Sequence, residues 1–288
     1  MNESRTTALV LGGGGSAGNA WLIGVLAGLS AGGLDVSDAD LIIGTSAGST
    51  AGAQLRGAPV ADLYTAILDA PMPAATPASP SGAGPSALEA TNAIIAASSG
   101  PDDLRRRAGA WAIGLDPAGE RSPRWRATVA SRLPTLSWPE ARLWITAVDA
   151  HTGDPVVFDR DSGVELADAI AASCAGGFAY DIDGRRYLDG GYRSNADNAD
   201  LAAGYERVLV LSPLSGRARI PVAWHQHLAD QVADLRADGS LVETVFPDAA
   251  ALAAFGRNMM DPSTRPPAAG AGFTQGRSAA RGLAAFWG

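Results

Sequence analysis

The stretch from Leu41 to Gly57 constrains the fold of this chain more than any other part. It begins with three apolar residues, which predict the end of a buried strand, and continues as the pattern G-x-S-x-G around Ser46. The residues that follow Ser46 favour a helix. In such a strand–turn–helix the serine lies at a sharp, strained turn, with its hydroxyl exposed above the sheet. Gly44 and Gly48 leave room for that turn because they lack Cβ.

Ser46 is therefore a candidate nucleophile. The start of the following helix adds positive partial charge where an oxyanion would form. The pattern by itself also fits a tight turn with an idle serine, because short motifs match by chance in a chain rich in Gly, Ala and Ser. Other stretches must decide between the two interpretations.

Composition limits the class of protein. A chain of 288 residues with 47% hydrophobic residues can form one large α/β domain or two small ones. Its net charge of −8 disfavours a nucleic-acid duplex as a partner. Cys174 is the single cysteine, so no internal disulfide can form and a reducing compartment is expected. With neither a signal-peptide pattern nor an apolar run of ~20 residues, the sequence predicts a cytoplasmic protein without a transmembrane helix.

The first part of the chain predicts a βαβα unit. Residues 7–11 form a short apolar run that ends in glycines, as a buried parallel strand does. Residues 19–31 place apolar side chains at helical spacing and end at a Gly-Gly pair. Residues 40–43 predict the second strand, which leads into Ser46. The crossover between the two strands should be right-handed.

The glycine loop after the first strand fits two functions. Residues 13–18 satisfy G-x-G-x-x-G, the pattern of a dinucleotide-binding loop. That function needs an acidic residue at the end of the second strand, whereas Asp38 and Asp40 precede it. Alternatively, consecutive backbone N–H groups of the loop bind an oxyanion. The misplaced acids favour the second function.

A hairpin late in the chain delivers a second acidic motif. Residues 182–188 predict two short strands around a tight Asp-Gly turn, which end at Asp189-Gly190-Gly191. Upstream, residues 143–148 predict a strand whose hairpin partner is 155–158. A buried strand is also expected over 207–211.

No cofactor or metal is expected. His151 lies near Asp149 and Asp154, but a polar turn explains the three residues better because no closed ligand set accompanies them. The basic run 105–107 is expected on a solvated helix face.

We predict a single domain over residues 1–288, because no linker separates two cores. The proline-rich stretches 71–86 and 261–276 are expected as mobile loops within that domain. A long helix that carries His225 and His227 is expected over 224–238, and a short terminal helix over 279–287.

The order of the three motifs is more specific than any one of them. A glycine loop, a G-T-S-A-G turn and a D-G-G motif follow one another, and together with their flanks the chain resembles the patatin-like phospholipases over residues 7–215. The resemblance implies a three-layer α/β/α sandwich with a central, mostly parallel sheet. A C-terminal helical extension would follow this core.

The resemblance also implies a mechanism. Ser46 would be the nucleophile and Asp189 the base that activates it, in a Ser-Asp dyad without histidine. The N–H groups of Gly13, Gly14 and Gly15 would form the oxyanion hole. The remaining motif glycines are Gly18, Gly44, Gly48, Gly190 and Gly191. The expected substrates are carboxylic esters of lipids or lipid-like molecules, which allows transient contact with a membrane surface.

Two departures from the family pattern leave an alternative open. The family's glycine loop usually carries Arg or Lys where this chain has Ala17, and the segment 176–180 is shorter than usual and lacks prolines. A catalytically weakened scaffold that binds a lipid or protein partner is therefore the second hypothesis.

Overall fold

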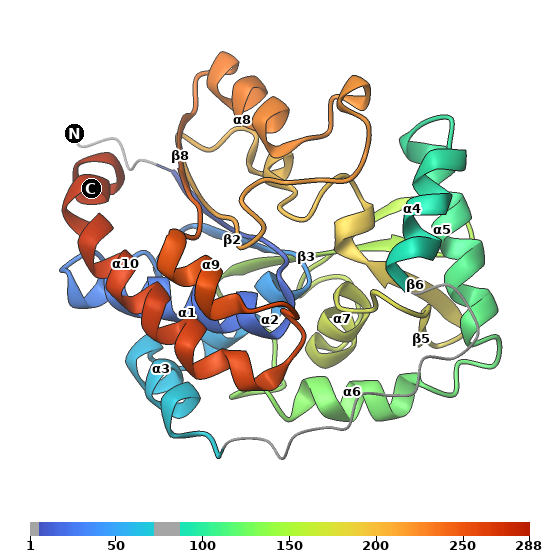
Figure 1. The fold of residues 1–288 in the computed structure, drawn as a ribbon, viewed down its shortest axis with the longest axis horizontal. Helices are drawn as coiled ribbons and strands as arrows, with labels where there is room; N and C mark the ends of the chain where they lie inside the picture. Colours follow the sequence, from blue (N-terminus) through green and yellow to red (C-terminus); the bar gives the residue numbers. More distant parts are fainter. Residues whose placement is uncertain (1–5, 72–86) are drawn as a thin grey trace.

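The structure is a computed structural model that describes residues 6–71 and 87–288 (Figure 1). In this part of the chain eight strands form one mixed sheet in the order β5-β6-β3-β2-β1-β7-β8, with β4 paired to β3. The strands are β1 (Thr7–Leu11), β2 (Leu41–Gly44), β3 (Arg142–Asp149), β4 (Pro155–Phe158), β5 (Tyr180–Ile182), β6 (Arg185–Asp189), β7 (Arg207–Leu211) and β8 (Leu241–Val245). The five strands from β3 to β8 along this order are parallel, whereas β4, β5 and β6 pair antiparallel.

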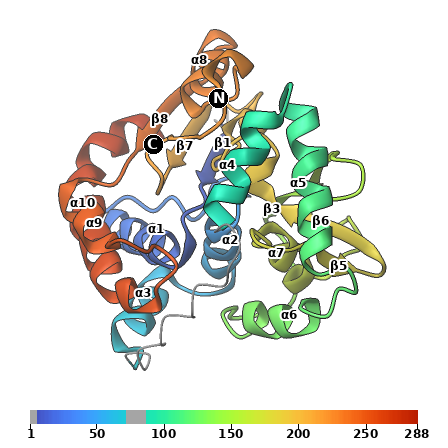
Figure 2. The ribbon, with the colours of Figure 1, turned by 45° about the vertical axis from the view of Figure 1, so that its right-hand side comes forward.

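Helices cover both faces of the sheet (Figures 1 and 2). They are α1 (Gly15–Ala31), α2 (Ala47–Gly57), α3 (Val60–Asp69), α4 (Ala87–Ala97), α5 (Pro101–Leu115), α6 (Ser122–Ala130), α7 (Leu166–Ser173), α8 (Leu228–Ala237), α9 (Ala249–Phe255) and α10 (Arg265–Trp287). Leu9 and Leu11 of β1 pack on the side of α1 and α10, whereas Ala8 and Val10 pack on the side of α8. This alternation follows from the two-residue period of a strand. The predicted α/β/α sandwich with a mostly parallel sheet is confirmed.

The C-terminal helix differs from the sequence prediction. Residues 261–276, expected as a mobile loop, form a short 3-10 turn and the first half of α10. Pro262 begins the 3-10 turn, and Pro266 and Pro267 lie in the first turn of α10, where a backbone N–H has no helical partner to lose.

Glycines of both helices bring α10 against α1. A Cβ added to Gly28 would lie 2.1 Å from Phe273 O, and one added to Gly276 would lie 2.2 Å from Val25 O. The small residues that suggested mobility thus permit close backbone contact between the two helices.

This close contact predicts opposite effects for one substitution at two sites. Gly28→Ala should lower the free energy of unfolding by about 1–3 kcal/mol, because the added methyl group pushes the helices apart. Gly282→Ala should raise it by up to about 1 kcal/mol, since alanine favours a helix and an added Cβ there meets no atom within 4 Å. Urea unfolding followed by circular dichroism measures both. A stabilising effect at Gly28 would contradict the close packing.

Three smaller expectations also differ or stay open. The helix expected over 224–238 is shorter, because His225 has a left-handed backbone and α8 begins at Leu228. Arg105 is buried, with its Nε donating to Gly153 O at 2.7 Å, so the basic run is not wholly solvated. Apart from Pro71, the stretch 71–86 lies outside the described residues.

Candidate active site

Three stretches that are distant in sequence meet at one edge of the sheet. β1 and β2 are parallel neighbours, so the glycine loop and the turn that contains Ser46 leave the sheet at the same edge. Asp189 arrives from the opposite direction, because β6 is antiparallel to β3. The last residue of β2 pairs with Ile145 of β3. Asp189 pairs with Ala147, two positions further along β3, and this register brings it to the level of Ser46.

The turn at Ser46 has the strained geometry that the sequence predicts. Ser46 has a φ of 51°, a left-handed value that is uncommon outside glycine. Its backbone N–H is fixed by a hydrogen bond to Ser173 Oγ at 2.9 Å. A Cβ on Gly44 would lie 2.5 Å from the backbone of α2, and a Cβ on Gly48 would lie 1.9 Å from the backbone of β1. Both glycines are therefore required by close packing around the serine.

Asp189 lies beside Ser46. The residue keeps some surface open, yet protein atoms surround its carboxyl, and this burial raises the pKa to about 6 because it disfavours the charged form. Two hydrogen bonds act in the opposite direction. Gly191 N–H donates to Oδ1 at 2.8 Å, and the Ser46 side chain bonds to the carboxyl. The structure thus brings together the two side chains that the sequence singled out.

The glycine loop supplies two free backbone donors. α1 begins at Gly15, with Gly14 as its N-cap, so it starts earlier than predicted. Within residues 6–71 and 87–288, neither the Gly14 nor the Gly15 N–H has a backbone acceptor. The N–H of Gly13, in contrast, donates to Ala196 O at 2.8 Å. The donor expected at Gly13 is already occupied, and the two that remain are at the start of a helix, where the partial charge is positive.

Ser46, Asp189 and Gly14 line a cavity of about 270 Å³. Arg219 is an exposed cation on its wall, with its Nη1 donating to Asn92 Oδ1 at 2.8 Å. Among the described residues Arg219 makes no ion pair. The lining residues are Gly13, Gly14, Thr45, Ser46, Gly176, Asp189, Gly191, Tyr192, Ala196, Leu214 and Arg219. The candidate nucleophile, a buried acid and a cation therefore line one cavity together with apolar residues.

The altered segment 176–180 does lie near the aspartate. Asp189 N–H donates to Ala175 O at 3.1 Å, and a Cβ on Gly176 would lie 3.7 Å from Asp189 Oδ2. Gly176, the first residue of this segment, lines the pocket.

A second buried acid lies under the glycine loop, and the sequence analysis did not single it out. A Cβ on Gly12 would lie 2.2 Å from Asp197 Oδ1. Burial raises the pKa of Asp197 to about 7, and a hydrogen bond with Ser212 lowers it in part. Asp197 Oδ1 has no hydrogen-bond partner in the described part of the chain. No local sequence pattern distinguished this aspartate from the other aspartates of the chain.

The C-terminal region braces the loop at Ala17. Ala17 is buried, and its N–H donates to Met259 O at 2.9 Å. Arg265 then reaches the same loop, with Nη1 donating to Ser16 O at 3.2 Å and to Asn19 Oδ1 at 3.0 Å. A guanidinium distant in sequence thus contacts the loop in which the family's usual cation is missing.

His227, and the acid Asp40 that was weighed for a dinucleotide-binding loop, both lie outside the cavity at Ser46. His227 is the N-cap of α8, and its ring Nε2 is 2.9 Å from Ile220 O. Asp40 accepts from Thr7 N–H at 2.7 Å, so it lies at the opposite end of β2 from the glycine loop.

Among the described residues no cluster of His, Cys, Asp or Glu could hold a metal ion. No helix in the same residues combines the length and apolar character needed to span a bilayer.

The chain has measurable similarity to known proteins. A family model described as Patatin-like phospholipase matches residues 9–202. VipD from Legionella pneumophila is similar in structure, with a TM-score of 0.44 and 13% identity over 97% of this chain and 67% of VipD. The type III effector ExoU is similar with a TM-score of 0.32 and 13% identity over 95% of this chain and 53% of ExoU. A complex of SpcU with ExoU from Pseudomonas aeruginosa is similar with a TM-score of 0.36 and 17% identity, over 94% of this chain and 52% of the matched chain.

This chain spans about half the length of ExoU. No curated protein sequence gives a significant match. Since all three TM-scores are below 0.5, the assignment rests on the family model, which contains the glycine loop, Ser46 and Asp189. Because that model matches most of the sequence, the chain belongs to the patatin-like phospholipase family.

Proposed function

We propose that this protein is a serine acyl hydrolase that cleaves carboxylic esters of lipids through an acyl-Ser46 intermediate. The observation that carries the proposal is the contact between Ser46 and a buried Asp189 whose pKa is raised to about 6. At neutral pH such a carboxylate is ionised and more basic than an exposed one, so it can accept the hydroxyl proton. Family membership supports lipid hydrolysis as the class of reaction.

The proposed reaction has two halves. Ser46 Oγ attacks the ester carbonyl carbon while its proton passes to Asp189, and the N–H groups of Gly14 and Gly15 bind the resulting oxyanion. The tetrahedral intermediate collapses, and Asp189 returns the proton to the departing alkoxide, which leaves as an alcohol. Water then attacks the acyl-serine, gives its proton to Asp189, and releases the fatty acid. Ser46 takes that proton back, which restores the starting state.

The pocket favours an amphipathic ester. Tyr192, Ala196 and Leu214 offer apolar surface, whereas Arg219 offers a positive charge at the same wall. A lipid that presents its ester here would approach from an aggregate or membrane surface, which is the transient contact we expect. We retain the cytoplasm as the expected compartment because one cysteine forms no internal disulfide.

A fluorophosphonate probe tests the proposal. The intact protein should be labelled covalently, and peptide mass spectrometry should locate the adduct on Ser46. Hydrolysis of p-nitrophenyl esters with different chain lengths should accompany labelling. Product analysis with a lipid panel then identifies the acyl chain and head group. If the wild-type protein shows neither labelling nor turnover, the hydrolase proposal fails. Tight retention of a lipid without turnover would favour the scaffold alternative.

A further inference from the structure

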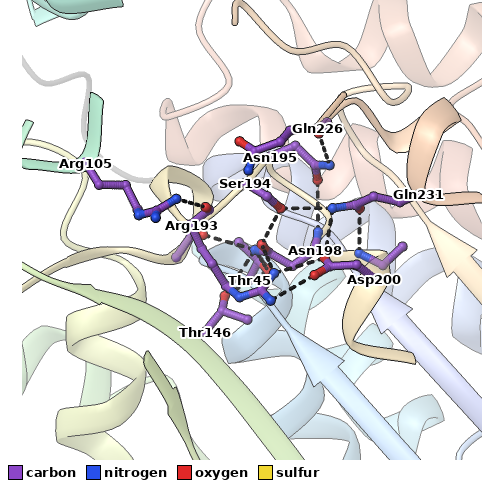
Figure 3. A network of polar contacts seen from close by, with 12 residues as sticks. Thr45, Arg105, Thr146, Arg193, Ser194, Asn195, Asn198, Asp200, Gln226 and Gln231 are labelled. Atoms are coloured by element: carbon purple, nitrogen blue, oxygen red, sulfur yellow. Dashed lines mark hydrogen bonds and ion pairs between the residues drawn. The ribbon is translucent and has the colours of Figure 1, made fainter. Parts of the chain in front are cut away.

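We infer that Asn198 positions the candidate nucleophile and base relative to each other, by joining the loops that carry them. Figure 3 shows this side chain at the centre of a polar network between the ends of β2 and β6. Asn198 Nδ2 donates to Thr45 Oγ1 at 2.9 Å and to Gly190 O at 3.0 Å. Thr45 directly precedes Ser46, and Gly190 directly follows Asp189. The inference rests on the proposed function, for which the separation of these two side chains matters.

The orientation of the Asn198 amide follows from its partners. Arg193 Nη1 donates to Oδ1 at 3.1 Å, and Ser194 Oγ donates to the same atom at 2.9 Å. A guanidinium cannot accept a hydrogen bond and a carbonyl cannot donate one. A reversed amide would therefore oppose Arg193 with a donor and Gly190 O with an acceptor. Both amide hydrogens have acceptors on the two catalytic loops, so the side chain has little freedom to turn.

The rest of the network holds Asn198 in place. Its backbone has a φ of 55°, a left-handed value that asparagine tolerates better than most residues. Its N–H donates to Asn195 Oδ1 at 2.9 Å. Arg193, which bonds its side chain, also pairs with Asp200 at 2.8 Å. Asn198 is completely buried, so a lost hydrogen bond there would not be replaced by bulk water.

No other side chain in the described part of the chain makes the same two contacts. Thr146 Oγ1 lies 2.9 Å from Thr45 Oγ1, and it bonds to the β2 side of the site. Among side chains of the described residues, only Asn198 makes hydrogen bonds to both residue 45 and residue 190. It lies in the connection from β6 to β7, eight residues after Gly190, and its side chain ties the start of that connection to the residue before Ser46. Asn198 is thus a positioning residue that need not touch substrate.

Asn198→Gly tests this role, because glycine accepts the left-handed backbone while the side chain is lost. Asn198→Asp is the second variant, since aspartate keeps the shape and the acceptor toward Arg193 but cannot donate when ionised. Gln231→Leu is the matched control. Gln231 is buried in the same network and bonds to Ser194, Ala199 and Asp200, but to neither Thr45 nor Gly190. The control therefore measures the effect of damaging the network while the hydrogen bonds from Asn198 to Thr45 and Gly190 remain.

Hydrogen exchange gives a readout that does not depend on activity. In Asn198→Gly, the segments 41–50 and 186–194 should both exchange at least about tenfold faster, because each loop loses one anchor. In Gln231→Leu, segment 41–50 should exchange as in the wild type. If segment 41–50 keeps its wild-type rate in both Asn198 variants, the positioning role is wrong. This result is independent of whether the protein turns over an ester.

Ester kinetics supply the second readout. Both Asn198 variants should lower kcat by about 10²-fold with a much smaller change in KM, since a misplacement of about 1 Å costs that much. Gln231→Leu should lower the melting temperature comparably but change kcat far less. Equal kcat losses in the Asn198 and Gln231 variants at equal melting temperatures would overturn the inference. If the wild-type protein shows neither fluorophosphonate labelling nor ester turnover, the proposed function is wrong. The hydrogen-exchange rates would still decide the role of Asn198.

Discussion

Replacing Ser46 with alanine should lower kcat for ester hydrolysis by about 10⁶-fold, the size of effect seen when a serine hydrolase loses its nucleophile. The hydroxyl is the atom that forms the acyl intermediate, so no neighbouring group can compensate. Ser49 Oγ does not replace it, because it donates to Ser46 O at 2.6 Å inside the helix. Steady-state hydrolysis of a p-nitrophenyl ester measures the loss.

The same variant should fold normally and lose fluorophosphonate labelling. Alanine fits the space of serine, although both are strained at the φ of 51°. Ser49→Ala is the control, since it removes a nearby hydroxyl from the same helix. If Ser46→Ala keeps substantial turnover, or if the label appears elsewhere, another residue is the nucleophile.

Asp189→Asn should lower kcat by about 10²–10⁴-fold, which is the usual contribution of a general base. The amide keeps the shape of the carboxyl and can still accept from Gly191 N–H, but it cannot take a proton from Ser46. His225→Ala should leave kcat within a small factor of the wild type, because His225 is exposed and precedes α8. A comparable loss in His225→Ala would exclude a mechanism without histidine.

The pH profile separates the two buried acids. Wild-type kcat/KM should fall as pH drops through about 6, where Asp189 takes up a proton and can no longer act as a base. Asp197 has a pKa of about 7, so Asp197→Asn is the informative control. In that variant kcat/KM should still fall as the pH drops through about 6. If this fall in kcat/KM moves to another pH in Asp197→Asn, the ionisation that controls activity belongs to Asp197.

The raised pKa of Asp189 also predicts an effect on stability. The folded state binds the Asp189 proton more tightly than the unfolded state, so this group contributes stability that is present at low pH and lost as pH rises toward about 6. Above that range the buried charge is a cost. Asp189→Asn, which removes the charge, should therefore melt at a higher temperature than the wild type at pH 8 and show no such gain at pH 4. Differential scanning calorimetry at the two pH values tests this sign.

Local sequence patterns predicted the elements of the fold that carry the candidate catalytic residues. The apolar run before Ser46, the glycines around it and the Asp-Gly turn before Asp189 are local signals, because each reflects backbone geometry that few residues satisfy. The order of these motifs predicted the family and the sandwich that the structure and the family model support.

Packing overrode local composition at the C-terminus. Glycine and proline favour loops on average, so residues 261–276 suggested mobility. Their backbone contact with α1 depends on residues far away in the sequence, which no local pattern reveals. The same limit applies to Arg265, whose contact with Ser16 joins the two ends of the chain.

The sequence by itself determined which side chains could do chemistry, because a nucleophile at a tight turn and an acid after a hairpin depend on short stretches. The tertiary structure alone decided which backbone donors are free, since Gly13 is occupied by a carbonyl from the loop at Ala196. It also decided the pKa of Asp189 and the link through Asn198. Burial and hydrogen bonds between distant segments set these properties, and both exist only once the chain has folded.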